Sequence, residues 1–130
     1  MSLRASATGR TFILARLAAT SMLLASPGVL AGTVVCSGTV ETIAYHANNS
    51  FMVRLSSMNT PVYFCNPETT WNLAGYSTGP QTCKMLYAMF LAARESGRAF
   101  SVVYFDSDDA PTACNTWATW KSASIRFFEY

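Results

Sequence analysis

Four cysteines constrain the fold of this chain most, because all of them lie beyond the first 31 residues. An even number of cysteines in a small exported chain indicates two disulfides, which could connect in three ways. The spacings contain no C-x-x-C and the chain has one histidine, so a zinc site and a thioredoxin-like redox pair are disfavoured. We favour Cys65–Cys83, which closes a loop of about 18 residues rich in Asn, Pro, Thr and Gly, together with Cys36–Cys114, which ties the opening strand to the segment before the last. Two disulfides predict an oxidising compartment.

The first 31 residues have the layout of a secretory signal peptide. Three arginines precede an apolar run from Leu17 to Leu30, and small or β-branched residues lead to a plausible cleavage position after Ala31. We therefore predict a signal peptide over residues 1–31 and a single domain over residues 32–130 that is secreted or periplasmic.

An uncleaved membrane anchor is the alternative for this leader. The apolar run is short and is interrupted by Pro27 and Gly28, which disfavours a membrane span. No later segment reaches the roughly 18 apolar residues that a span requires. We therefore expect no transmembrane anchor after cleavage.

The charge of the remaining domain limits its partners. The whole chain has 9 Lys and Arg against 7 Asp and Glu, but three of the basic residues belong to the predicted leader. The domain is left with 6 basic and 7 acidic residues, a net charge of −1 with His46 neutral. Nucleic acid is therefore not expected as a partner. Its 16 aromatic residues suit a core, and they also suit sugar recognition, in which a flat ring packs against C–H faces.

The first half of the domain has the alternation of β-strands. A long strand is predicted over Thr33–Ala47, and its apolar phase slips after Glu41, which indicates a bulge or bend at Gly38 or near Thr42. Two shorter strands are predicted after it, over Phe51–Ser56 and Val62–Cys65.

The second half contains the one helical pattern. Apolar residues at spacings of three and four predict a helix over Gln81–Ser96, with Pro80 suited to its first position and Gly97 to its end. Strands are predicted over Ala99–Phe105 and Ser122–Tyr130, and loops over Asn66–Pro80 and Asp106–Thr116.

The predicted order is β-β-β-α-β-β, mainly β with one helix. This order is expected of an OB-fold, a five-stranded Greek-key barrel, here with two disulfides. An open α+β sheet with one covering helix is the rival architecture.

Few residues could support catalysis or metal binding. His46 lies in a strand without a nucleophile-elbow sequence, and we expect a solvated or hydrogen-bonded ring there. The acidic run Asp106, Asp108 and Asp109 lacks the glycine and distal glutamate of a calcium loop, so we expect a solvated turn. Nothing places two of the glutamates together for glycoside hydrolysis; these are Glu41, Glu68 and Glu95. We expect no enzymatic activity, no metal and no cofactor.

Four stretches carry a resemblance to a known family. They are Ser37-Gly38-Thr39-Val40, Val62-Tyr63-Phe64-Cys65, the helix that closes with Gly97, and Phe100-Ser101-Val102-Val103-Tyr104. In these stretches the chain resembles the B subunits of subtilase cytotoxin and of its typhoid-toxin-like relatives among the AB5 toxins. The resemblance spans most of the domain. It implies an OB-fold that binds sialylated glycans of the host, forms a homopentamer and carries a separate toxin A subunit.

The resemblance also implies a glycan site at Ser37 and Tyr104. The serine of the S-G-x-V stretch contacts sialic acid in that family, and a tyrosine at the end of the strand after the helix joins the same pocket. Ser37 falls on the polar face of its predicted strand, where it could also be an ordinary exposed serine, and Tyr104 could be a core ring. The chain departs from the family at Thr33 and Val34, where an acidic residue is usual, and at its lone Cys114, where a C-terminal cysteine pair is usual.

Two other functions fit the sequence. The first is a periplasmic accessory or structural OB-fold protein without glycan binding. The second is an inhibitor of a periplasmic or secreted enzyme that uses Trp71, in the loop Asn66–Pro80, as its anchor.

Overall fold

The computed structural model describes residues 31–130, so the predicted signal peptide over residues 1–31 lies outside the described residues except for Ala31. The described part of the chain forms seven strands, one α-helix and one 3-10 turn. In chain order they are β1 (Gly32–His46), β2 (Ser50–Leu55), β3 (Val62–Cys65), β4 (Trp71–Leu73), β5 (Tyr76–Thr78), α1 (Pro80–Ser96), β6 (Ala99–Ser107), η1 (Cys114–Thr116) and β7 (Ser124–Glu129). The prediction of a mainly β domain with one α-helix is confirmed.

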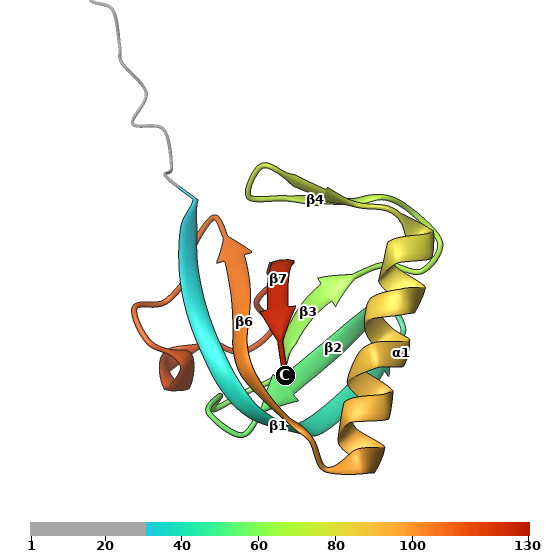
Figure 1. Ribbon diagram of the computed structural model, residues 1–130. Coiled ribbons are helices and arrows are strands. Elements are labelled where there is room, and N and C mark those ends of the chain that lie inside the picture. The colour runs from blue at the N-terminus through green and yellow to red at the C-terminus, as the bar shows by residue number, and fades with distance from the viewer. Residues whose placement is uncertain (1–30) are drawn as a thin grey trace, which may run out of the picture.

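Five of the strands form one antiparallel sheet in the order β3-β2-β1-β6-β7 (Figure 1). The two edge regions of this sheet also meet, because Tyr63 in β3 forms a parallel bridge with Ser122, just before β7. The Tyr63 N–H donates to the Lys121 carbonyl at 2.9 Å, and the Ala123 N–H donates to the Tyr63 carbonyl at 2.8 Å. Backbone groups at the β3 edge are therefore hydrogen-bonded to the segment that leads into β7.

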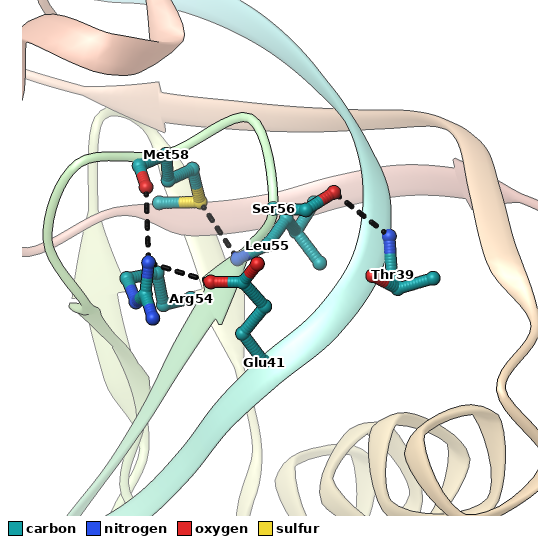
Figure 2. A network of polar contacts seen from close by, with 6 residues as sticks. All are labelled: Thr39, Glu41, Arg54, Leu55, Ser56 and Met58. Atoms are coloured by element: carbon teal, nitrogen blue, oxygen red, sulfur yellow. Dashed lines mark hydrogen bonds and ion pairs between the residues drawn. The ribbon is translucent and has the colours of Figure 1, made fainter.

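The long strand β1 belongs to both halves of the sheet, and its pairing shifts register twice. One shift falls between Cys36 and Gly38 opposite β6, and the other falls just before Thr42 opposite β2. Gly38 has φ +111°, and a Cβ there would lie 2.0 Å from Ser56 Oγ. That same oxygen accepts the Thr39 N–H at 3.1 Å (Figure 2). The bulge or bend predicted at Gly38 or near Thr42 is confirmed, with a register shift at each place. The positive φ and the close Ser56 hydroxyl favour glycine at position 38.

Polar contacts hold the curved β1 against β2 and the turn that follows it (Figure 2). Glu41 Oε2 lies 2.6 Å from Arg54 Nη1, which also donates to the Met58 carbonyl at 3.5 Å. The Leu55 N–H points to Met58 Sδ at 3.4 Å. Glu41 is therefore engaged in a structural ion pair.

The helix α1 packs its apolar face on the sheet. Its buried residues are Cys83, Leu86, Phe90 and Ala93. Phe90 contacts the rings of Phe64 and Phe100 at centroid distances of 5.5 and 5.2 Å. Burial of such a ring stabilises the fold by about 1.5–3 kcal/mol. The predicted helix is confirmed with a start at Pro80 and a stop at Gly97, whose φ is +66°.

Both disulfides are present in the pairing that we favour from the sequence. Cys65–Cys83 is fully buried and fastens β3 to α1. Cys36–Cys114 fastens β1 to η1, across 78 positions of the sequence. The second bond therefore tethers the segment between β6 and β7, which otherwise has little regular structure.

Two predicted loops need correction. The segment predicted as a loop over Asn66–Pro80 contains the hairpin β4–β5, which turns at Ala74 and Gly75 with φ values of +53° and +80°. The hairpin is fastened to β7, because the Ser124 hydroxyl donates to the Leu73 carbonyl at 3.1 Å. The loop predicted from Asp106 begins two residues later, because β6 extends to Ser107.

Within residues 31–130, no helix has the length and apolar character that a membrane span requires.

Candidate functional site

Ser37 and Tyr104 lie on adjacent strands, on the same face of the sheet. Ser37 is exposed on β1, and its backbone N–H donates to Ser57 Oγ at 3.2 Å. Val35 shares the exposed face of β1 with Ser37, and Val35 pairs directly with Tyr104 of β6. The structure thus brings the two predicted site residues to one surface, offset by two positions along β1.

Tyr104 is half-buried and turns away from the core. Its neighbours in β6, Val103 and Phe105, are both fully buried. The ring of Tyr104 meets the ring of Phe127 in β7 edge to face, with centroids 5.9 Å apart. Tyr104 is therefore part of the outer face of the sheet.

Arg126 adds a cation to this surface. The pairing of β6 with β7 shifts register between Tyr104 and Phe105, which leaves Arg126 as an extra residue, so that Arg126 and Phe127 are both exposed. The guanidinium carbon lies 5.2 Å from the centroid of Tyr104 and 5.7 Å from that of Tyr76. Two rings therefore flank the cation, an arrangement that cation–π attraction stabilises.

A buried carboxylate anchors the same arginine. Asp106, at the end of β6, is 3% exposed, accepts the Thr33 hydroxyl at 2.5 Å and lies 3.3 Å from Arg126 Nε. Arg126 Nη1 also donates to the Tyr76 hydroxyl at 3.3 Å. The prediction that Asp106 belongs to a solvated turn is wrong, because β6 continues through it and the carboxylate gains two partners inside the protein.

We name this surface the Arg126 face. It consists of Tyr76, Tyr104, Arg126 and Phe127, and a hollow of about 300 Å³ lies over the last three. Ser37 lies near the face but does not line that hollow. Arg126 was not predicted from the sequence, because its partners Tyr76, Tyr104 and Asp106 come from two other strands, β5 and β6, and only the folded sheet brings them together.

A second hollow lies on the other half of the sheet. It has a volume of about 430 Å³ and is lined by the end of β1, by β2, by the turn before β3 and by the segment before β7. We name it the Trp120 pocket, and the side chains that define it are Tyr45, His46, Met52, Thr60, Thr119 and Trp120.

The His46 ring lines this pocket. Its ring meets the rings of Tyr63 and Trp120 at centroid distances of 5.5 and 5.3 Å, and its Nδ1 accepts the Asn48 N–H at 3.3 Å. The expected hydrogen-bonded ring is present. Trp120 was not predicted as a site residue from the sequence. It lies three positions after Trp117, and the two side chains differ in exposure: Trp117 is 3% exposed and Trp120 is 60% exposed.

The remaining acidic residues serve structural contacts or lie on the surface. Glu68 Oε2 accepts the Asn49 side-chain amide at 2.6 Å, and Glu95 is exposed in α1. Asp109 pairs with Lys121, and hydrogen bonds from Lys121 and from the Ser107 hydroxyl lower the pKa of the Asp109 carboxyl. Among residues 31–130, no group of three or more His, Cys, Asp or Glu side chains is arranged to hold a metal ion.

No protein-family model matches this chain, and neither a curated protein nor a solved structure matches it. A functional conclusion therefore has to come from the geometry of these two surfaces.

Proposed function

We propose that this protein is an exported OB-fold domain that binds sialylated glycans through the Arg126 face. The strand order supports the fold, because β1, β2, β3, β6 and β7 follow the five-strand order of a Greek-key barrel with α1 between the third and fourth. The bridge between Tyr63 and Ser122 supports a closed sheet over an open α+β sheet.

The observation that carries the function is an arginine held between two tyrosine rings. Sialic acid presents a carboxylate on a hydroxylated ring, and a guanidinium binds a carboxylate through strong, charge-assisted hydrogen bonds. Within the described residues, Arg126 donates one hydrogen bond, from Nη1 to the Tyr76 hydroxyl, and forms an ion pair with Asp106 through Nε, out of five N–H donors. The others remain for a ligand, and the rings of Tyr104 and Phe127 supply apolar surface for its C–H groups.

Ser37 supplies a hydroxyl beside this surface. It is exposed on the strand next to Tyr104, so an extended glycan bound at Arg126 could reach it. We assign Ser37 a secondary role, as a hydrogen-bonding partner of the ligand.

The proposal extends to the assembly. A single weak glycan site gains avidity when several copies act together, which suits a homopentamer. In the proposed assembly the pentamer carries a separate toxin A subunit and has no catalytic role itself. Light scattering on the purified domain measures this part independently. A monomer would favour the alternative function, a periplasmic accessory or structural protein.

One observation separates the proposal from the enzyme-inhibitor alternative. Trp71, the anchor in that alternative, is half-buried in β4, and its indole N–H is covered by protein. A binding anchor has to present its ring to the partner. Trp71 is therefore better placed to pack the hairpin against the domain.

The test compares sialyllactose with lactose by calorimetric titration of the purified domain 32–130. We expect wild type to prefer sialyllactose, and Arg126→Gln to lower that preference by about tenfold or more, because a hydrogen bond to a charged group is worth about 1.5–3 kcal/mol. Ser37→Ala should have a smaller effect in the same direction.

Arg98→Gln is the matched control, since the Arg98 guanidinium also lies over a ring, 4.4 Å from the centroid of Tyr130, but outside the Arg126 face. It should bind as wild type does. Equal binding of sialyllactose and lactose by wild type, or an unchanged preference in Arg126→Gln, would show that the proposed site is wrong.

A further inference from the structure

The Trp120 pocket presents exposed rings around a hollow rather than on a flat patch. Trp120 is 60% exposed and Tyr45 is 52% exposed, whereas Met52 at the base is 5% exposed. The volume of about 430 Å³ lies in the range of small-ligand sites, about 300–1,000 Å³. The pocket therefore has the size and depth to hold one part of a small ligand.

The backbone at Trp120 is held in a conformation that a bulky residue rarely adopts. Its φ is +64°, in the left-handed region that favours glycine. The ring stacks on Tyr63, with centroids 6.0 Å apart and an interplanar angle of 26°. On its C-terminal side, Lys121 is fixed by the backbone bond to Tyr63 and by its ion pair with Asp109. Strain of this kind persists where the surroundings impose it, and it is common at binding sites.

The chemistry of the lining selects the class of ligand. Among residues 31–130, no Asp, Glu, Lys or Arg side chain lines the pocket, and the basic residue next to it in the sequence, Lys121, is paired with Asp109. A nucleotide needs basic groups along its phosphates, so it does not fit this lining. A quaternary ammonium has no hydrogen-bonding group, so it would leave the hydroxyls of Thr60 and Thr119 without a partner in the ligand. The aromatic faces suit the C–H face of a sugar, and the hydroxyls of Thr60 and Thr119 suit its uncharged polar groups.

We propose that the Trp120 pocket is a second carbohydrate site, specific for an uncharged sugar ring that stacks on the indole of Trp120. It is separate from the Arg126 face, because its walls come from β1, β2 and the segment before β7, whereas the Arg126 face lies on β5, β6 and β7. It does not depend on sialic acid binding and could exist without it.

The test is a tryptophan-fluorescence titration of the domain 32–130 with the methyl glycosides of galactose, glucose and N-acetylglucosamine. We expect at least one of them to shift the emission to the blue with millimolar affinity, because a stacked sugar removes water from the exposed indole. Trp120→Asn should weaken this binding by about tenfold or more, with nuclear magnetic resonance reporting affinity where the fluorescent ring is gone. Asparagine tolerates the left-handed backbone, so the variant keeps the turn.

Trp71→Phe is the control, because it removes a tryptophan outside the pocket, and it should leave the affinity unchanged. Sialyllactose preference should survive Trp120→Asn, which separates failure of this site from failure of the Arg126 face. Three results would each overturn the proposal: no saturable response to any of the three glycosides, equal affinity in Trp120→Asn, or loss of oligomers in Trp120→Asn by light scattering, which would show that a second copy of the chain occupies the pocket.

Discussion

The Arg126 face and the Trp120 pocket use the same kind of side chain for different chemistry. Both present aromatic rings, but Tyr76 and Tyr104 flank a cation, whereas Tyr45, His46 and Trp120 surround an uncharged hollow. Aromatic content alone therefore does not define a ligand. The neighbours of the rings decide it, through one arginine at the first surface and threonine hydroxyls at the second.

The two surfaces also lie beside irregular backbone. Arg126 is exposed beside Phe127 because the pairing of β6 with β7 shifts register there, and the exposed Trp120 lies in a turn before β7 with a positive φ. A regular strand would turn one of each neighbouring pair of side chains inward. The register shift therefore explains why Arg126 and Phe127 both face the solvent, whereas the Trp120 pocket lies beside a turn.

The largest expected effect comes from removing the Cys36–Cys114 disulfide, which should affect the two surfaces unequally. The pair Cys36→Ala and Cys114→Ala should lower the free energy of unfolding by about 4–5 kcal/mol, since the bond closes a loop of 78 positions. Because Cys114 starts the segment that leads to Trp120, neutral-sugar binding should weaken more than sialyllactose binding.

Replacing the other disulfide provides the comparison. The Cys65–Cys83 bond closes a shorter loop of 18 positions. Cys65→Ala with Cys83→Ala should therefore lower the free energy of unfolding, measured in urea, by about 3 kcal/mol. Equal losses in the two variants, or free thiols in the purified protein by mass mapping, would contradict this explanation.

A smaller effect should follow from neutralising the carboxylate behind Arg126. Asp106→Asn should lower the free energy of unfolding by about 1–3 kcal/mol, because the buried group loses its charge-assisted contacts with Arg126 and Thr33. Sialyllactose affinity should fall as Arg126 loses its anchor, whereas the affinity of the Trp120 pocket should not change.

Glu41→Gln is the matched control, because its ion pair with Arg54 is partly exposed. It should cost no more than about 1 kcal/mol and leave both binding activities intact. An Asp106→Asn domain that binds sialyllactose as tightly as wild type would show that the buried carboxylate does not position Arg126.

The smallest expected effect is on the pH dependence of stability, through Asp109, which pairs with Lys121 next to Trp120. The pKa of Asp109 is lowered from its ordinary value of 3.8 by hydrogen bonds from Lys121 and Ser107. A carboxyl whose pKa is lower in the folded state stabilises the fold above its unfolded pKa. This contribution disappears as the pH falls from about 3.8 through the lower folded value.

Asp109→Asn should remove this part of the acid dependence. Because the pair with Lys121 is exposed, the change in unfolding free energy at pH 7 should be between 0 and about 1 kcal/mol. Thermal unfolding measured between pH 2 and pH 7 checks the prediction, and identical acid limbs for wild type and Asp109→Asn would contradict it.

The sequence predicts the features that depend on local patterns. The helix follows from apolar spacings and its flanking Pro80 and Gly97, and the irregular β1 follows from the phase slip after Glu41. The disulfide pairing is correct because it matches the order of strand and loop segments. The helix and the irregular strand need no knowledge of distant neighbours, whereas Cys36–Cys114 joins residues 78 positions apart and belongs to one of only three possible pairings.

The features that the sequence does not predict are long-range. The hairpin β4–β5 has three-residue strands, too short for a visible alternation, and it is held by β7. Asp106 looks solvated beside Asp108 until its partners Thr33 and Arg126 are known. The surroundings of Trp120 include Tyr45 and His46, which are more than 70 positions away, so only the folded sheet reveals the pocket.

One cross-comparison measures whether the Arg126 face and the Trp120 pocket bind different ligands. Sialyllactose and the neutral methyl glycosides are titrated against wild type, Arg126→Gln and Trp120→Asn, with affinities read from the same nuclear magnetic resonance spectra. We predict that Arg126→Gln lowers the preference for sialyllactose by about tenfold or more and leaves neutral-sugar affinity unchanged. Trp120→Asn should weaken neutral-sugar binding by about tenfold or more and leave the preference for sialyllactose unchanged. If each substitution weakens the binding of both ligands to the same extent, the Arg126 face and the Trp120 pocket are not separate binding sites.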